Sequence, residues 1–134
     1  MSVQVLKKAA RLKLAELTPA IPTAYEAFPF DPPAGLYQRL QFVVQRPDDP
    51  VLGDQYYRER IQMQVFLNAP AGVGTSQVDT QAELLRQHFR KGLSFEQDGM
   101  NVYVLRTPQI SGTIVLQNRV IIPVFIELVG EVFS

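Results

Sequence analysis

A strict alternation of apolar and polar residues runs through the middle of the chain, from Tyr56 to Leu67. The two parities separate cleanly into apolar Ile61, Met63, Val65 and Leu67 and polar Arg58, Arg60, Gln62 and Gln64. Because successive strand residues point to opposite faces of a sheet, the pattern predicts a long strand with one apolar and one polar face. We expect the rest of the chain to cover the apolar face or to extend the polar one.

Two other segments show the spacing of amphipathic helices. The first runs from about Val3 to Leu17 and follows Ser2, a favourable N-cap residue. The second runs from about Gln77 to Arg90. Their apolar stripes are Val3, Leu6, Ala10, Leu14 and Leu17 in the first, and Val78, Ala82, Leu85 and Phe89 in the second. The basic side chains of the first helix lie off its stripe, which favours a solvated face over a membrane-binding one.

Six further segments have the alternation or the β-forming composition of strands. They are Thr23–Phe28, Tyr37–Gln45, Leu93–Glu96, Met100–Arg106, Thr113–Leu116 and Val120–Val129. A loop over residues 46–55 should join the second of them to the central strand as an antiparallel pair, and Asp98-Gly99 and Gln117-Asn118 should form tight turns. The sequence predicts one α+β domain over residues 1–134, with two helices packed on one face of a largely antiparallel mixed sheet.

The segment Val120–Val129 is apolar at both parities, as in a strand that is buried on both faces. Pro123 cannot donate to a ladder, however, which favours an edge position or a bulge. An edge strand that is apolar on both faces needs a cover. The hypothesis is therefore a subunit interface that includes Ile121, Phe125 and Val129.

Charge and composition exclude several classes of function. The chain has 13 basic and 13 acidic residues and no cysteine. A neutral chain has no global attraction to nucleic acid, and without cysteine there is no disulfide, thiol nucleophile or zinc–thiolate site. No apolar run reaches the roughly 20 residues that span a bilayer. Arg58 and Arg60 beside Tyr56 leave nucleic-acid binding as an alternative, although Glu59 interrupts this basic stretch.

No group of residues predicts catalysis. His88 is the single histidine and has no partner residues for a metal or a general base. The stretch Gly72–Thr75 precedes a helix but lacks the lysine of a phosphate-binding loop. Asp79 and Glu83 are one helical turn apart, a spacing that is common by chance. We expect no enzyme activity, no cofactor and no metal.

Several short stretches, in this order and spacing, resemble a family of phage and prophage tail terminators, also called tail completion proteins. They are Pro22–Glu26, Phe30–Tyr37, Pro47–Pro50 with Leu52-Gly53, Tyr57–Arg60 with Gln64-Val65, Pro70–Gly74 and Leu105–Pro108. Similarity to the lambda-type terminator implies an α/β sandwich that forms a hexameric ring, caps the growing tail tube and docks to the connector of the head. The resemblance implies no catalytic residue.

On this basis the expected function is that of a virion structural protein and tail terminator. The alternatives are a head–tail adaptor or another minor tail protein, and, from a different class, a nucleic-acid-binding accessory protein. The expected partners are further copies of the chain, as a hexamer in the assembled tail, the tail tube protein and the head–tail connector. The protein should occur in the host cytoplasm during assembly and then in the virion tail. The predicted interface residues are Asp48, Asp49, Leu52, Arg58, Arg60, Ile121, Phe125 and Val129.

Overall fold

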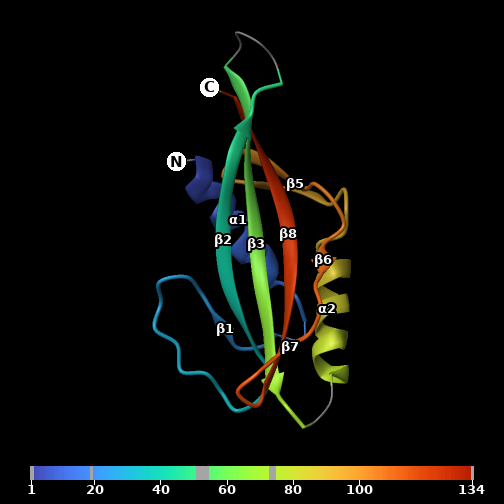
Figure 1. The fold of residues 1–134 in the computed structure, drawn as a ribbon. Helices are drawn as coiled ribbons and strands as arrows, with labels where there is room; N and C mark the ends of the chain where they lie inside the picture. Colours follow the sequence, from blue (N-terminus) through green and yellow to red (C-terminus); the bar gives the residue numbers. More distant parts are fainter. Residues whose placement is uncertain (1, 19, 51–54, 73–74, 134) are drawn as a thin grey trace.

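One sheet of eight strands forms the frame of the computed structural model, which describes residues 2–18, 20–50, 55–72 and 75–133 (Figure 1). Neighbouring strands follow the order β1-β2-β3-β8-β5-β4, and β6 and β7 also pair with β8. β1 and β2 are parallel, whereas the other described pairs are antiparallel. The strands are β1 Thr23–Ala24, β2 Tyr37–Asp48, β3 Tyr56–Pro70, β4 Ser94–Gln97, β5 Met100–Val104, β6 Gln109–Ile110, β7 Ile114–Leu116 and β8 Arg119–Phe133.

Two helices cover one face of this sheet, α1 (Ser2–Ala15) and α2 (Ser76–His88). Both pack on the central strands β3 and β8, and α1 passes behind β2 and β3 in Figure 1. In β3 the odd-numbered residues from Ile61 to Ala69 are buried beneath the helices, whereas the even-numbered residues are half-buried on the other face. The predicted fold class is confirmed: an α+β fold with two helices on one face of a largely antiparallel mixed sheet.

The core lies between the helices and this face of the sheet. The predicted stripe of α1 is buried at Leu6, Ala10 and Leu14, with Ala9 in addition, and the stripe of α2 is buried throughout. Facing them from β8 are Ile122, Val124, Ile126 and Leu128. Within the described part of the chain, no helix lies on the opposite face of the sheet, which is called the open face below.

The start of α1 differs from the prediction. Ser2 lies inside the helix, and its hydroxyl donates a hydrogen bond to Glu59 Oε2 at 2.6 Å instead of capping the helix. Glu59 is buried on the helix side of β3, where a carboxylate needs such a partner. The hydroxyl therefore ties the first turn of α1 to the sheet.

β8 is a central strand, and the predicted edge position was wrong. β3 pairs with all of β8 on one side, and β5, β6 and β7 divide the other side between them. Ser111 N donates to Pro123 O at 2.9 Å, so the carbonyl group of Pro123 points toward the side of β6 and β7. In an antiparallel strand the N–H and C=O of one residue point to the same side, so the N–H that proline lacks would also face β6 and β7. There the ladder is interrupted between Ile110 and Ile114. Pro123 is tolerated because it lies opposite a gap between two short strands.

The connection between β2 and β3 is shorter than predicted. β2 continues to Asp48, and a change of register between Gln45 and Asp48 marks a β-bulge. The first three residues of the predicted loop are therefore strand. Residues 51–54, which include the predicted interface residue Leu52, lie outside the described residues.

Both predicted tight turns are present. Asp98 and Gly99 have φ angles of 51° and 83° between β4 and β5, and Gln117 and Asn118 have φ angles of 49° and 65° between β7 and β8. Two successive positive φ angles are typical of the type I′ turn, whose twist suits a hairpin.

Candidate assembly surface

A chain of polar side chains crosses the upper part of the open face and links four strands. Arg58 on β3 pairs with Asp48 on β2 at 3.4 Å and donates through Nε to the Tyr56 hydroxyl at 3.1 Å. That hydroxyl donates to Glu131 Oε2 on β8 at 2.7 Å, and Asn101 Nδ2 on β5 donates to Glu131 Oε1 at 2.7 Å. These two hydrogen bonds lower the pKa of Glu131, that from Asn101 first, and the bond to Glu131 raises the pKa of Tyr56.

A second charged group on this face is centred on Glu127 of β8. Arg106 Nε lies 3.0 Å from Glu127 Oε2, and Arg60 lies 3.9 Å from Glu127 Oε1. Arg58 and Arg60 thus each have an acidic partner within the same chain. This local neutralisation reduces the attraction for phosphate on which nucleic-acid binding depends.

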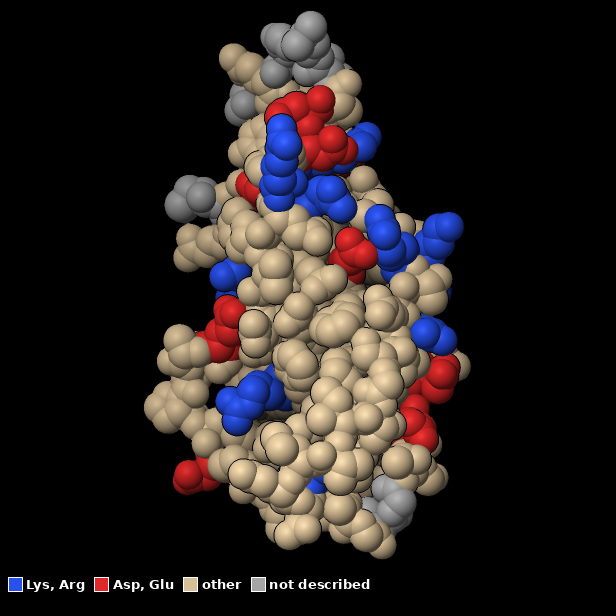
Figure 2. All heavy atoms as spheres, viewed as in Figure 1, with Lys and Arg blue, Asp and Glu red and all other residues tan. Residues whose placement is uncertain are grey.

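The lower part of the open face has few charges. Figure 2 shows charged side chains gathered at the upper end of this face and a broad stretch below them that is almost free of charge. On β8 the side chains of Ile121 and Phe125 are half-buried here, opposite Asn68 and Gln64 of β3. This part of the face is suited to contact with another protein surface.

The structure places the predicted interface residues in three settings. Asp48, Asp49 and Arg60 line one shallow surface hollow together with Arg46 and Pro47. Ile121 and Phe125 are partly exposed on the open face. Val129, by contrast, is only 2% exposed, so it offers no free apolar surface. Its neighbours across the ladders are Arg60 and Tyr103, whose longer side chains project from the same face of the sheet.

The largest exposed apolar stretch of strand was not predicted as a site. All three residues of β7 are exposed, with Val115 at 70%, and among the described strands β7 pairs with β8 alone. β2 is similar: beyond Arg39 the described strands leave its outer edge unpaired, and Val43 and Val44 are exposed there. The sequence pattern that could have indicated this exposed strand is the run of three apolar residues, Ile114 to Leu116, directly before the turn at Gln117-Asn118.

A proline-rich segment is held against the lower end of the sheet by Arg119. Its guanidinium donates to the carbonyl oxygens of Ala34 and Gly35 at 2.8 and 2.9 Å and lies 5.2 Å from the centre of the Tyr37 ring. Phe28, in the same segment, is 72% exposed. The segment adds a further apolar side chain to the surface of the molecule.

The residues considered for catalysis have structural settings. His88 Nε2 lies 2.6 Å from the carbonyl oxygen of Lys13, so the ring links α2 to the end of α1. Asp79 and Glu83 are exposed on α2, and the described residues include no cluster of three potential metal ligands. Gly74 lies outside the described residues. Within the part of the chain that is described, no helix has the length and apolarity to cross a membrane.

Comparison with known proteins gives one family and one fold. A solved structure, whose title states no function, shares 22% sequence identity with the chain, covers 100% of this chain and 99% of its own, and superposes with a TM-score of 0.78. At this identity the likeness shows the fold alone. No curated protein matches the chain. The family described as "phage tail terminator protein" matches residues 5–127, nearly the whole length. The chain therefore belongs to the phage tail terminator family, a family of structural proteins of the phage tail.

Proposed function

We propose that this protein ends the growth of a phage tail by closing a ring of identical subunits on the last exposed surface of the tail tube, and that the other rim of the ring receives the connector of the head. Membership of the tail terminator family is the observation that supports this most directly. Six subunits is the number that the resemblance to lambda-type terminators implies. In this role the subunits act through their shape and their contacts, and no catalytic group is needed.

The distribution of apolar strand surface supports a ring. A ring is built from heterologous contacts, in which one patch of a subunit meets a different patch of its neighbour. The described residues include two such patches on strands with edges that no described strand pairs: β7, with Ile114, Val115 and Leu116, and the outer edge of β2, with Val43 and Val44. We assign these two edges to the subunit contact, with β7 of one copy against β2 of the next.

The edge of β2 is only partly open, which restricts how a neighbour can bind. Phe42 N on this edge donates to Glu26 Oε2 at 2.9 Å, and Lys7 lies 3.7 Å from the same carboxylate. A side chain that occupies a backbone donor discourages unspecific strand pairing. The neighbour should therefore contact β2 beyond this point, at Val43 and Val44.

Electron microscopy of purified protein mixed with tails that lack a terminator tests this function. The expected result is a ring at one end of each tail and no further elongation when tube protein is added. Binding to purified connectors without binding to tubes would instead indicate a head–tail adaptor and would refute termination. The nucleic-acid alternative predicts a salt-dependent gel shift with DNA, which we do not expect.

The contact itself is tested by Val115→Glu, which places a charge on an exposed residue of β7. The variant should fold normally and lose ring formation, measured by light scattering after size exclusion over a series of concentrations and by binding to tails. Leu12→Glu is the matched control, because Leu12 is also an exposed apolar residue (47%) but lies on α1. Equal assembly of Val115→Glu and wild type would remove β7 from the contact.

A further inference from the structure

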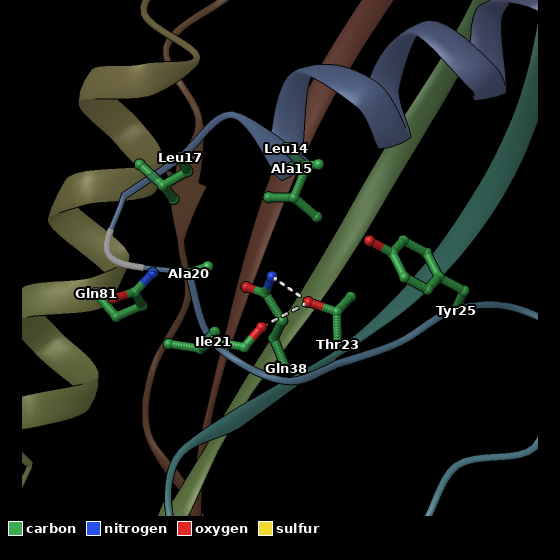
Figure 3. Close-up of a pocket in the computed structure, with 9 residues that line it drawn as sticks. All are labelled: Leu14, Ala15, Leu17, Ala20, Ile21, Thr23, Tyr25, Gln38 and Gln81. Atoms are coloured by element: carbon green, nitrogen blue, oxygen red, sulfur yellow. Dashed lines mark hydrogen bonds between the residues drawn. The ribbon is translucent and has the colours of Figure 1, made fainter.

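The two sides of the sheet differ in what they offer to a partner. On the helix side, a cavity of about 140 Å³ lies where the end of α1, β2 and α2 meet (Figure 3). There Gln38 Nε2 donates to Thr23 Oγ1 at 2.9 Å, and the two amide atoms without a hydrogen-bond partner, on Gln38 and Gln81, are buried out of reach of a ligand. On the open face, by contrast, charged side chains are accessible from solvent (Figure 2).

The group of charges around Glu127 has an excess of positive charge. Arg106 and Arg60 both pair with this one carboxylate, at 3.0 and 3.9 Å. Among the described residues, neither arginine forms an ion pair with a second acidic side chain. The Arg106 side chain is 62% exposed, so its guanidinium can bind a further carboxylate from another molecule.

The group around Glu131 has an excess of negative charge. Its carboxylate accepts from Tyr56 and Asn101, which are neutral donors, and no lysine or arginine in the described part of the chain lies within ion-pair distance of it. Arg58, the cation next along the network, is itself paired with Asp48. The two neutral hydrogen bonds hold the half-buried carboxylate in position, and it has further lone pairs that can accept from a cation.

The two groups are placed symmetrically about Val129. β8 keeps one register with β3 along its whole length, so every second side chain of β8 points to the open face. Glu127 and Glu131 lie two residues before and after Val129, about 13 Å apart at the rise of a strand. Phe125, half-buried, and Phe133, 76% exposed, lie four residues before and after it. Along β8 the open face thus presents an aromatic ring, a positive group, a negative group and a second aromatic ring.

A series of groups with this symmetry is complementary to its own copy turned by 180°. When two open faces meet with their β8 strands antiparallel and Val129 on the two-fold axis, Glu131 of each copy faces the Arg106 of the other. Phe133 of each copy then faces Phe125 of the other. An isologous contact of this kind contains each favourable pair twice. Facing sheets pack about 10 Å apart, a gap that these long side chains fill from both sides.

The lateral positions of the partners agree with this arrangement. Asn101, which holds Glu131, lies on β5, and Arg106 follows the end of β5. A two-fold axis that runs across the strands reverses their direction but keeps β5 of both copies on the same side, so Arg106 of one copy approaches Glu131 of the other beside Asn101. Arg60, opposite Val129 on β3, is directed at Glu127 and so away from the axis.

We propose that two copies of the chain pair through their open faces as a symmetric dimer, in which Arg106 of each copy binds Glu131 of the other. The pairing covers the aromatic side chains at both ends of the contact, which a free molecule exposes to water. β7 takes no part in it. The proposal therefore does not rest on the ring or on the role in tail termination.

Sedimentation equilibrium of the full chain over a series of concentrations tests the pairing. The wild type should show a reversible equilibrium of monomer and dimer. Glu131→Arg should weaken dimerisation by roughly tenfold or more, because two ion pairs are lost and like charges then face each other at both places. Glu83→Arg, the same change at an exposed position of α2, is the matched control and should dimerise like wild type. A wild type that is monomeric at every concentration, or equal dimerisation of Glu131→Arg, would overturn the proposal.

An exchange of charges tests which two residues meet. Arg106→Glu alone should also weaken dimerisation by roughly tenfold, because glutamate then faces Glu131 of the other copy. An equimolar mixture of Arg106→Glu and Glu131→Arg should form a heterodimer about as tightly as the wild type dimerises, since each contact then joins opposite charges. A mixture that stays as weak as its components would refute the pair. If Glu131→Arg does not fold, Arg106→Glu decides, because its exposed side chain can change without disturbing the core.

The aromatic contact is tested by Phe133→Ser. Loss of the buried ring should weaken dimerisation by roughly tenfold or more. Phe28→Ser is the matched control, because Phe28 is exposed to a similar extent (72%) but lies in the proline-rich segment, so it should dimerise like wild type. Equal effects of the two substitutions would contradict the proposed contact.

Val115→Glu separates this pairing from the ring contact. The variant lacks the apolar edge of β7 assigned to the ring and keeps the open face unchanged, so it should still form the dimer, and the charge variants should have the same effects in this background. If Val115→Glu is monomeric at every concentration, association occurs through β7, and the pairing of open faces is wrong. Failure of the ring leaves this test unaffected, because the dimer is measured without tails.

Discussion

Replacing Gly130 with alanine would place a methyl group in a part of the core that has no room for it. Gly130 lies on the helix side of β8, and a Cβ atom there would overlap Met100 Sδ and come within 3.2 Å of Met100 Cγ and 3.3 Å of Leu6 Cδ1. Ordinary contacts between carbon atoms lie at about 3.5–4.0 Å. Either Met100 or the packing of α1 on the sheet must shift to accept the methyl group.

The size of the effect follows from two opposing contributions. Overpacking a core costs about 1–3 kcal/mol. Because the φ angle of Gly130 is one that alanine can adopt, the substitution also restricts the unfolded chain, which stabilises by about 0.4–1 kcal/mol. Taking the middle of each range, about 2 and 0.7 kcal/mol, the net loss in the free energy of unfolding is about 1.3 kcal/mol. With roughly 2.1 cal/mol/K per residue for the entropy of unfolding, this lowers the Tm by about 5 °C.

Urea unfolding and thermal melts measure this loss, and two further variants isolate its cause. Gly112→Ala is the matched control, because nothing lies within 4 Å of its Cβ position, so it should be neutral or slightly stabilising. Met100→Ala combined with Gly130→Ala should be less destabilised than the sum of the single variants by roughly 1 kcal/mol, since the methyl group then fills vacated space. Wild-type stability of Gly130→Ala, or an equal loss in Gly112→Ala, would refute this account of the packing.

Two other predictions concern the open face and the hairpin of β7 and β8. Glu131 has a lowered pKa in the folded state, so its contribution to stability is present above the unfolded value near 4.5 and is lost as the pH falls through the folded value. In thermal melts between about pH 3 and 6, Glu131→Gln should thus lose less stability on acidification than wild type, and parallel curves would contradict this. Gln117→Asn should raise the free energy of unfolding by roughly 0.5 kcal/mol, because asparagine tolerates the positive φ of 49° better than glutamine; a lower Tm would contradict it.

The central strand, the first helix and the two tight turns were predictable because each depends on a pattern among residues that are close together in the sequence. The alternation at Ile61 to Leu67 and the stripe around Leu14 depend only on which side chains face the core, and both appear in the structure as expected. The turns at Asp98-Gly99 and Gln117-Asn118 were equally visible, since few residue pairs adopt two positive φ angles readily.

The neighbours of each strand were not predictable in the same way. Pro123 correctly indicated a break in a ladder, but the break belongs to the gap between β6 and β7 and not to an edge of the sheet. The exposure of Val129 could not be judged either, because the strand that lies beside it, β5, is about 25 residues away along the chain. The cavity at Gln38 and Gln81 joins three distant elements and has no signature in the sequence.

The position of β8 has a consequence for the order in which the fold can form. The strands β3, β5, β6 and β7 all precede β8 in the chain, and each of them pairs with it. A nascent chain on the ribosome therefore has the β2–β3 and β4–β5 hairpins without the strand that unites them, and pairing across such sequence distances is slow. The sheet should therefore be completed only after β8 has emerged from the ribosome, so a chain that lacks β8 should not reach the native fold.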